Sequence, residues 1–168
     1  MLNTAVIPQP LVQSTQILSQ LKSGQIFRVK GGGGTAMIIC HRHHAELAGP
    51  GAAVGSGFDL DCCRLIPIGN VSLVYAESRA ERQQGYAIRQ KWLGLTQKAM
   101  DSSVPLQRAR NILILLEKYF GAETVSSLPD EVLAQLVGVL PKTLGMARRD
   151  NQPQVVNRSQ KKPQQIAV

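Results

Sequence analysis

All the cysteines and histidines of the chain lie within residues 40–63. The candidate ligands among them are Cys40, His41, His43, Cys62 and Cys63, and thiolate with imidazole is the donor set that zinc prefers. The spacing forms no standard C-x-x-C or C-x-x-H zinc knuckle, and successive residues of a strand point to opposite faces, so the five groups are not expected to converge together. His41 and His43, two positions apart, could share one face. We expect buried thiols beside exposed, polar histidines and predict no cofactor; a metal or redox site remains an alternative.

Two further groups of residues have types that could do chemistry. Asp59 and Asp61, with Glu46 nearby, resemble an acid/base pair, but no nucleophile or base accompanies them, so we interpret them as solvated loop residues. The four glycines at 31–34 precede no Lys-Ser or Lys-Thr, so they predict a hairpin between two strands and not a phosphate loop. The sequence therefore predicts a protein that is not an enzyme.

The strongest functional pattern lies in residues 131–149, which have the spacing of a helix-turn-helix. Ala134 is small where two helices must approach closely, and Gly138 can adopt the positive φ that the turn between them requires. The expected scaffold consists of Leu133, Ala134, Val137, Gly138 and Leu144. The positions of the second helix that lie nearer the outer surface are the candidate DNA contacts: Lys142, Thr143, Met146, Arg148 and Arg149.

The stretch VPLQRARNILILLEKYFG, residues 104–121, followed by LPDEVLAQLVGVLPKTLGMARR, residues 128–149, resembles the C-terminal DNA-binding domain of the Crp/Fnr transcriptional regulators. The resemblance covers about residues 104–149 and implies a transcriptional regulator that reads specific sequences in double-stranded DNA. The N-terminal half carries no cyclic-nucleotide phosphate cassette, so no nucleotide ligand is implied. Residues 152–168 are largely polar, with the pair Val155-Val156 early in the segment, so the wing of that family is expected to be truncated or absent.

Composition and charge agree with a nucleic-acid partner. The net charge is +8, and basic side chains release counterions when they neutralise phosphates. Aromatic residues make up only 4% of the chain, too few for base-stacking platforms of the kind that bind single strands. The chain shows no secretory leader and no apolar run long enough for a membrane span, so we expect a cytoplasmic protein without a membrane partner. We also expect a homodimer, because one short helix reads few base pairs.

The elements that must position these residues change type along the chain. A helix is expected over residues 12–21, followed by a mostly antiparallel unit with β runs at 25–29, 35–40, 64–68 and 71–75. Residues 77–100 predict one or two helices, with Gly85 and Gly94 as weak points. A clear amphipathic helix begins near Pro105 and ends at Gly121, and shorter helices follow at 129–137 and 141–149.

The sequence as a whole predicts an α+β fold. We divide it into a small β-containing domain at 1–76, a helical connector at 77–101 that could form a dimer contact, a helix-turn-helix domain at 102–150, and a disordered basic tail at 151–168. Two alternatives to a DNA-binding regulator remain open. One is a protein-interaction adaptor with a degenerate helix-turn-helix, and the other is a metal- or redox-sensing regulator that uses the Cys/His cluster.

Overall fold

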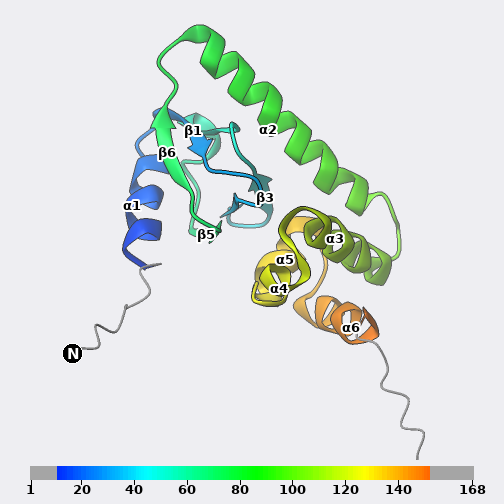
Figure 1. Cartoon of the computed structure of the whole chain (residues 1–168). Coiled ribbons are helices and arrows are strands. Elements are labelled where there is room, and N and C mark those ends of the chain that lie inside the picture. The colour runs from blue at the N-terminus through cyan, green and yellow to red at the C-terminus, as the bar shows by residue number, and fades with distance from the viewer. Residues whose placement is uncertain (1–10, 152–168) are drawn as a thin grey trace, which may run out of the picture.

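A β-rich N-terminal part is followed by a helical C-terminal part (Figure 1), which confirms the expected α+β class. The computed structural model describes residues 11–151, with side chains from residue 16 onward. The tail and truncated wing expected beyond residue 151 lie outside the described residues.

The β-rich part contains two three-stranded sheets in which every pairing is antiparallel. One sheet has the order β4 (Ala53–Gly55), β1 (Ile26–Lys30) and β6 (Ser72–Tyr75), and the other has the order β3 (Ala45–Ala48), β2 (Ala36–Cys40) and β5 (Arg64–Ile68). The four expected β runs correspond to β1, β2, β5 and β6. The strands β3 and β4 were not expected, because their short, alanine-containing sequences carry few of the β-branched and aromatic residues that favour strands.

The glycine-rich segment 31–34 is a link between the sheets and not the hairpin that the sequence predicted. The strands on either side of it, β1 and β2, belong to different sheets and do not pair with each other. Gly34 has φ +76°, and the Thr35 hydroxyl donates to the Gly32 carbonyl at 2.6 Å, so the chain turns here before it enters β2. The interpretation was wrong because a turn signal does not show which strands pair.

The helix α1 (Leu11–Leu21) precedes the strands, a short 3-10 turn, η1 (Ser56–Phe58), follows β4, and the long helix α2 (Arg79–Met100) follows β6. A capping box begins α2: the Ser78 hydroxyl accepts from the Glu81 N–H, and the Glu81 carboxylate accepts from the Ser78 N–H. The two glycines of α2 differ, because a Cβ at Gly85 would lie 3.0 to 3.3 Å from Ala53 of β4, whereas a Cβ at Gly94 would meet nothing within 4 Å. Gly85 is therefore a point of close packing as well as a weak helix former.

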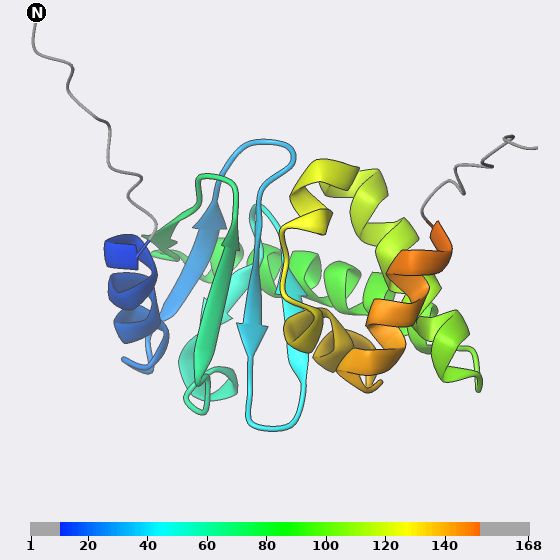
Figure 2. The same cartoon turned by 90° about the horizontal axis from the view of Figure 1, so that it is seen from below.

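Four helices form the C-terminal part: α3 (Pro105–Phe120), α4 (Ala122–Ser126), α5 (Asp130–Val137) and α6 (Pro141–Asn151). Three of them were expected, and α4 occupies part of the segment predicted as a loop. The helix α3 packs against α4, α5 and α6, and α5 also packs against α6. In Figure 2 the strands stand between α1 on one side and these helices on the other, with α2 running behind both.

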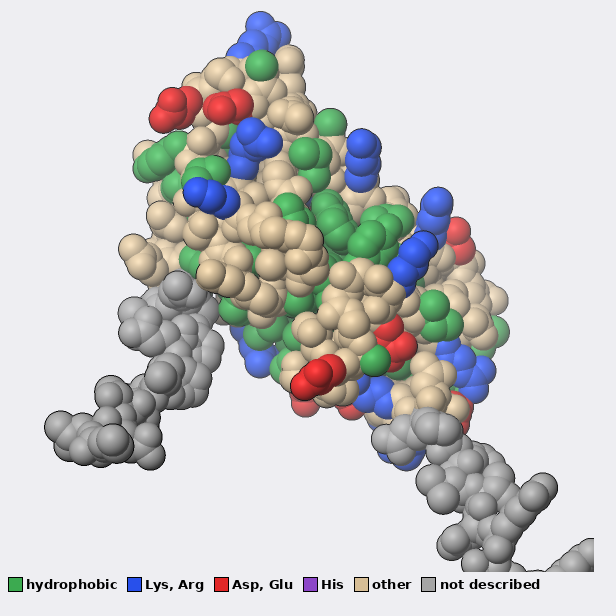
Figure 3. Space-filling view, viewed as in Figure 1, with side chains coloured by type: hydrophobic (Ala, Val, Ile, Leu, Met, Phe, Trp, Pro, Cys, Tyr) green, Lys and Arg blue, Asp and Glu red, His purple; other side chains and the backbone are tan. Residues whose placement is uncertain are grey.

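The two parts of the chain share their core. One buried cluster joins Ile38 and Leu47 of the β3-β2-β5 sheet to α3, α5 and α6, and a second lies between the sheets and α1. Trp92 of α2 packs against both clusters and stacks on Phe120 with ring centroids 6.2 Å apart. Hydrophobic side chains gather in the middle of one face, where α2, β3 and α3 meet (Figure 3). The helix α2 is thus a packed part of the fold and not only a connector.

None of the helices within residues 11–151 combines the length and apolar character that a membrane span requires.

Candidate functional site

The two C-terminal helices α5 and α6 are joined by a tight turn. The first helix, α5, ends at Gly138, which adopts the left-handed conformation with φ 60° and ψ 47° and donates its N–H to the Ala134 carbonyl. The second helix, α6, begins three residues later at Pro141. The other scaffold residues of the sequence prediction, Leu133, Ala134, Val137 and Leu144, are at most 1% exposed. These four side chains therefore belong to the buried core between α5 and α6.

The five candidate DNA contacts do not share one environment. Lys142, Met146 and Arg149 are exposed, and Thr143 is half-buried in the first turn of α6. Positions 142, 146 and 149 are four and three residues apart, so they lie on one face of the helix. Neither Lys142 nor Arg149 has an ion-pair or hydrogen-bond partner for its side chain among the residues that the structure describes, and both charges are free to meet an anion.

Arg148 has a structural role that corrects its expected place as a phosphate contact. Its guanidinium donates to the Asp130 carboxylate at 2.7 Å, to the Val125 carbonyl at 3.1 Å and to the Leu128 carbonyl at 2.8 Å. These bonds join α6 to the end of α4 and the start of α5. Position 148 lies four residues after the buried Leu144, on the same side of α6, and the Arg148 side chain is only 22% exposed.

A second polar site lies in the β-rich part and is built around Arg89 of α2. The guanidinium contacts both carboxylate oxygens of Asp59, at 2.7 and 2.9 Å, and also donates to Glu46 of β3 and to the Ala53 carbonyl. Asp59 is fully buried and accepts a further bond from the Gly55 N–H at 2.6 Å. The interpretation of Asp59 as a solvated loop residue was therefore wrong.

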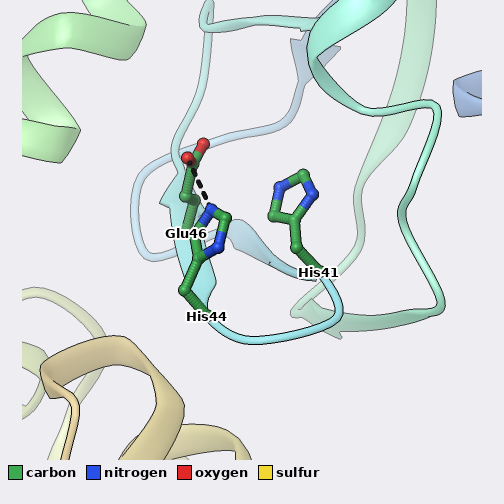
Figure 4. Close-up of side chains that lie close together, drawn as sticks. All are labelled: His41, His44 and Glu46. Atoms are coloured by element: carbon green, nitrogen blue, oxygen red, sulfur yellow. Dashed lines mark hydrogen bonds and ion pairs between the residues drawn. The ribbon is translucent and has the colours of Figure 1, made fainter.

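Two histidines of the β2–β3 hairpin adjoin this cluster. The His41 ring is 3% exposed, with Nδ1 2.7 Å from Oδ1 of Asp61 and Nε2 3.5 Å from Oδ1 of Asp59. His44 stacks on it with ring centroids 4.5 Å apart and places Nε2 3.3 Å from Oε1 of Glu46 (Figure 4). His43 is exposed, and the imidazole that stacks on His41 is that of His44, which lies opposite His41 in the hairpin.

The charges and hydrogen bonds of the cluster lower the pKa values of two carboxyl groups, those of Glu46 and Asp61. Burial by itself would raise the pKa of Glu46, but the hydrogen bond and charge of Arg89 outweigh it and hold the pKa below its ordinary value. The hydrogen bond to His41 likewise lowers the pKa of Asp61. Burial would lower the pKa of Arg89, but Asp59 and Glu46 outweigh it and raise the pKa. The Arg89 guanidinium and the Glu46 carboxylate therefore stabilise each other as ions.

The three cysteines do not converge with the histidines as ligands. Cys40 and Cys62 are buried, and burial raises the pKa of both thiols, that of Cys62 to about 11. Cys63 is exposed, with its sulfur 3.3 Å from the Cys40 carbonyl. Within residues 16–151, the group of three residues whose potential ligand atoms all lie within 4.8 Å of one another consists of His41, His44 and Glu46, without a cysteine. Of the candidate ligands of the sequence analysis, this group contains His41 alone.

Comparison of the chain with protein-family models, with curated proteins and with solved structures finds no match. The two sites must therefore be interpreted from their own geometry.

Sequence reasoning did not place Arg89 in a site, and it did not join His44 to Glu46. Arg89 is buried because α2 packs over β3 and β4, and those contacts join segments that are distant in the sequence. The signal for His44 and Glu46 was present, because they are two positions apart and residues with that spacing lie on one face of a strand. That signal required β3 to be identified as a strand.

Proposed function

We propose that the protein is a sequence-specific DNA-binding transcriptional regulator that uses α5, the turn after it, and α6. The division of α6 into two faces carries the proposal. Leu144 and Ala147 are fully buried in the core, whereas Lys142, Met146 and Arg149 lie together on the exposed side. A short helix anchored by one face and presenting cations on the other suits the major groove of duplex DNA.

The free cations of α6 support the same proposal. Lys142 lies in the first turn of the helix and Arg149 two turns later, so the two charges are spaced along the helix axis. Because neither is paired among the described residues, contact with DNA phosphates would not break an existing ion pair. Lys142 and Thr143 are placed for base edges or phosphates at the N-terminal end of the helix, and Arg149 is suited to phosphate.

In this proposal the protein acts in the cytoplasm as a homodimer. One α6 helix reaches few base pairs, and a twofold pair of helices reading two half-sites supplies the additional affinity. The net charge of +8 adds a sequence-independent attraction to the duplex.

Selection of genomic DNA fragments by the full chain, followed by fluorescence anisotropy on the recovered duplexes, tests the proposal. The Lys142→Ala/Arg149→Ala variant is expected to bind DNA at least tenfold more weakly. The slope of its log binding constant against log salt concentration should become shallower by the amount expected for about two lost phosphate contacts. A matched control, Arg79→Ala/Lys91→Ala, removes two exposed cations of α2 and should retain the wild-type preference.

Two results would overturn the proposal: unspecific recovery of DNA by the wild type, or an equal loss in both double variants. Absence of salt-dependent DNA binding would favour the adaptor, in which the same helices bind another protein.

A further inference from the structure

We propose that the β2–β3 hairpin forms a binding site for a divalent transition metal, with Zn²⁺ as the best-suited ion. The protein ligands are His41 through Nε2, His44 through Nε2 and Glu46 through Oε1. The potential ligand atoms of these three residues lie within 4.8 Å of one another. This inference does not depend on the proposed DNA binding.

The hairpin brings the three side chains together for simple geometric reasons. Cys40 pairs with Ala45, and the His41 N–H donates to the His44 carbonyl at 2.8 Å, so His41 and His44 close the hairpin opposite each other. Side chains of directly opposed residues lie on the same face of a sheet. Glu46 follows His44 by two residues and therefore shares that face.

His41 is held in the orientation of a metal ligand. Its Nδ1 lies 2.7 Å from the Asp61 carboxylate, an arrangement in which Nδ1 carries the proton and Nε2 is left as the donor atom. This Nε2 is buried and has no hydrogen-bond partner among the described residues, with the nearest carboxylate oxygen, on Asp59, at 3.5 Å. A buried nitrogen without a partner costs free energy, and a bound cation would satisfy it.

His44 and Glu46 already have the separation that coordination requires. Two ligands of a tetrahedral zinc site lie about 3.3 Å apart, and His44 Nε2 is 3.3 Å from Glu46 Oε1. The other carboxylate oxygen of Glu46 accepts from Arg89, which fixes the carboxylate and leaves Oε1 for the metal. The His44 side chain is 55% exposed, so an ion can enter from solvent on this side.

The local charge favours a divalent cation. Three carboxylates, those of Glu46, Asp59 and Asp61, surround the two histidines, and Arg89 is the one guanidinium paired with them among the described residues. With neutral imidazoles the cluster carries two uncompensated negative charges, which one divalent ion would balance. Two imidazoles and one carboxylate select first-row transition metals over Mg²⁺ and Ca²⁺, which prefer oxygen ligands alone.

Isothermal titration calorimetry of the full chain with Zn²⁺, after chelator treatment and removal of any affinity tag, tests the proposal. The wild type should bind one ion. His44→Ala should weaken binding at least tenfold, whereas His43→Ala, a change of the adjacent exposed histidine, should leave affinity within twofold of wild type. Both positions are exposed, so neither variant is expected to disturb folding, which circular dichroism would verify.

A positioning variant and a spectroscopic probe complete the test. Asp61→Asn should weaken Zn²⁺ binding about tenfold, because it removes the carboxylate that orients His41. Co²⁺ bound to the wild type should give the intense visible absorption of a four-coordinate ion, and His44→Ala should abolish it. The proposal is overturned by the absence of one-to-one Zn²⁺ binding, by equal losses in His43→Ala and His44→Ala, or by Mg²⁺ competing at equal concentration.

Discussion

Arg89 of α2 and Asp59, which follows η1, form a buried two-point ion pair with Nη1–Oδ2 and Nη2–Oδ1 distances of 2.7 and 2.9 Å. Both ions are desolvated, so each depends on the other for compensation. Removal of one partner from a buried pair typically costs about 3–5 kcal/mol, because the remaining charge has lost its counterion. We expect Arg89→Ala to lower the free energy of unfolding by about that amount in urea titrations.

The same helix offers a control for the Arg89 prediction. Lys91 is exposed, and Lys91→Ala should change the free energy of unfolding by less than about 0.5 kcal/mol. An Arg89→Ala variant as stable as Lys91→Ala would show that the ion pair does not hold α2 to the sheets.

The adjacent arginines of α6 should separate stability from DNA binding. Arg148 bridges α6 to Asp130 and two carbonyl groups, so Arg148→Ala should destabilise the protein by about 1–3 kcal/mol. Arg149 is exposed and unpaired among the described residues, so Arg149→Ala should leave stability within about 0.5 kcal/mol and weaken DNA binding. Thermal unfolding and fluorescence anisotropy on both variants measure the two effects. A larger stability loss for Arg149→Ala would contradict the geometry.

Alanine substitutions at the two glycines of α2 should differ in their effect on the free energy of unfolding. At Gly94 a Cβ meets nothing within 4 Å, so Gly94→Ala should stabilise the helix by about 1 kcal/mol through its higher helix propensity. At Gly85 the new Cβ would press on the backbone of Ala53 at 3.2 Å, and a strand backbone yields less than a side chain. Gly85→Ala should therefore fail to stabilise the protein. Denaturant titration of both variants measures the two effects. Equal gains in the free energy of unfolding would show that the contact between position 85 and Ala53 is unimportant.

Local patterns predicted much of the fold. The αL glycine at position 138, the buried Leu144 and the helical spacing of α3 depend on residues close in sequence, and each was correctly predicted. The capping box at Ser78 and Glu81 was also readable, but it was not used to place the start of α2. Local chemistry thus defined helices well, since their hydrogen bonds join residues four apart.

Features that depend on long-range packing could not be predicted. The separation of β1 and β2 into two sheets, the strands β3 and β4, and the burial of Arg89 all follow from contacts between distant segments. Asp59 and Arg89 are thirty residues apart, and neither residue type indicates burial by itself. The inward orientation of Arg148 was missed for the same reason, because its acceptors belong to other elements.

The three cysteines should differ sharply in reactivity towards iodoacetamide. The thiolate is the nucleophile, and Cys62, with a pKa of about 11, is almost wholly protonated at pH 8. Cys40 is buried with a raised pKa, whereas Cys63 is exposed. Native protein should therefore incorporate label at Cys63 alone, with the other two reacting after unfolding in urea. Peptide mass spectrometry would identify the sites, and rapid labelling of Cys62 in the folded state would contradict the burial.

Acid should weaken the fold through the carboxylates beside the histidines. The pKa of Glu46 is lower in the folded protein than its ordinary value, so the folded state binds fewer protons there than the unfolded chain does. The resulting stabilisation is complete above the ordinary glutamate pKa of about 4.3 and is lost as the pH falls through the lower, folded value. Asp61 contributes with the same sign. Urea titrations in EDTA between pH 6 and pH 3 should show a steeper loss of stability for wild type than for Glu46→Gln. Glu131→Gln, at an exposed position of α5, should keep the wild-type steepness, and an unchanged slope in Glu46→Gln would refute the linkage.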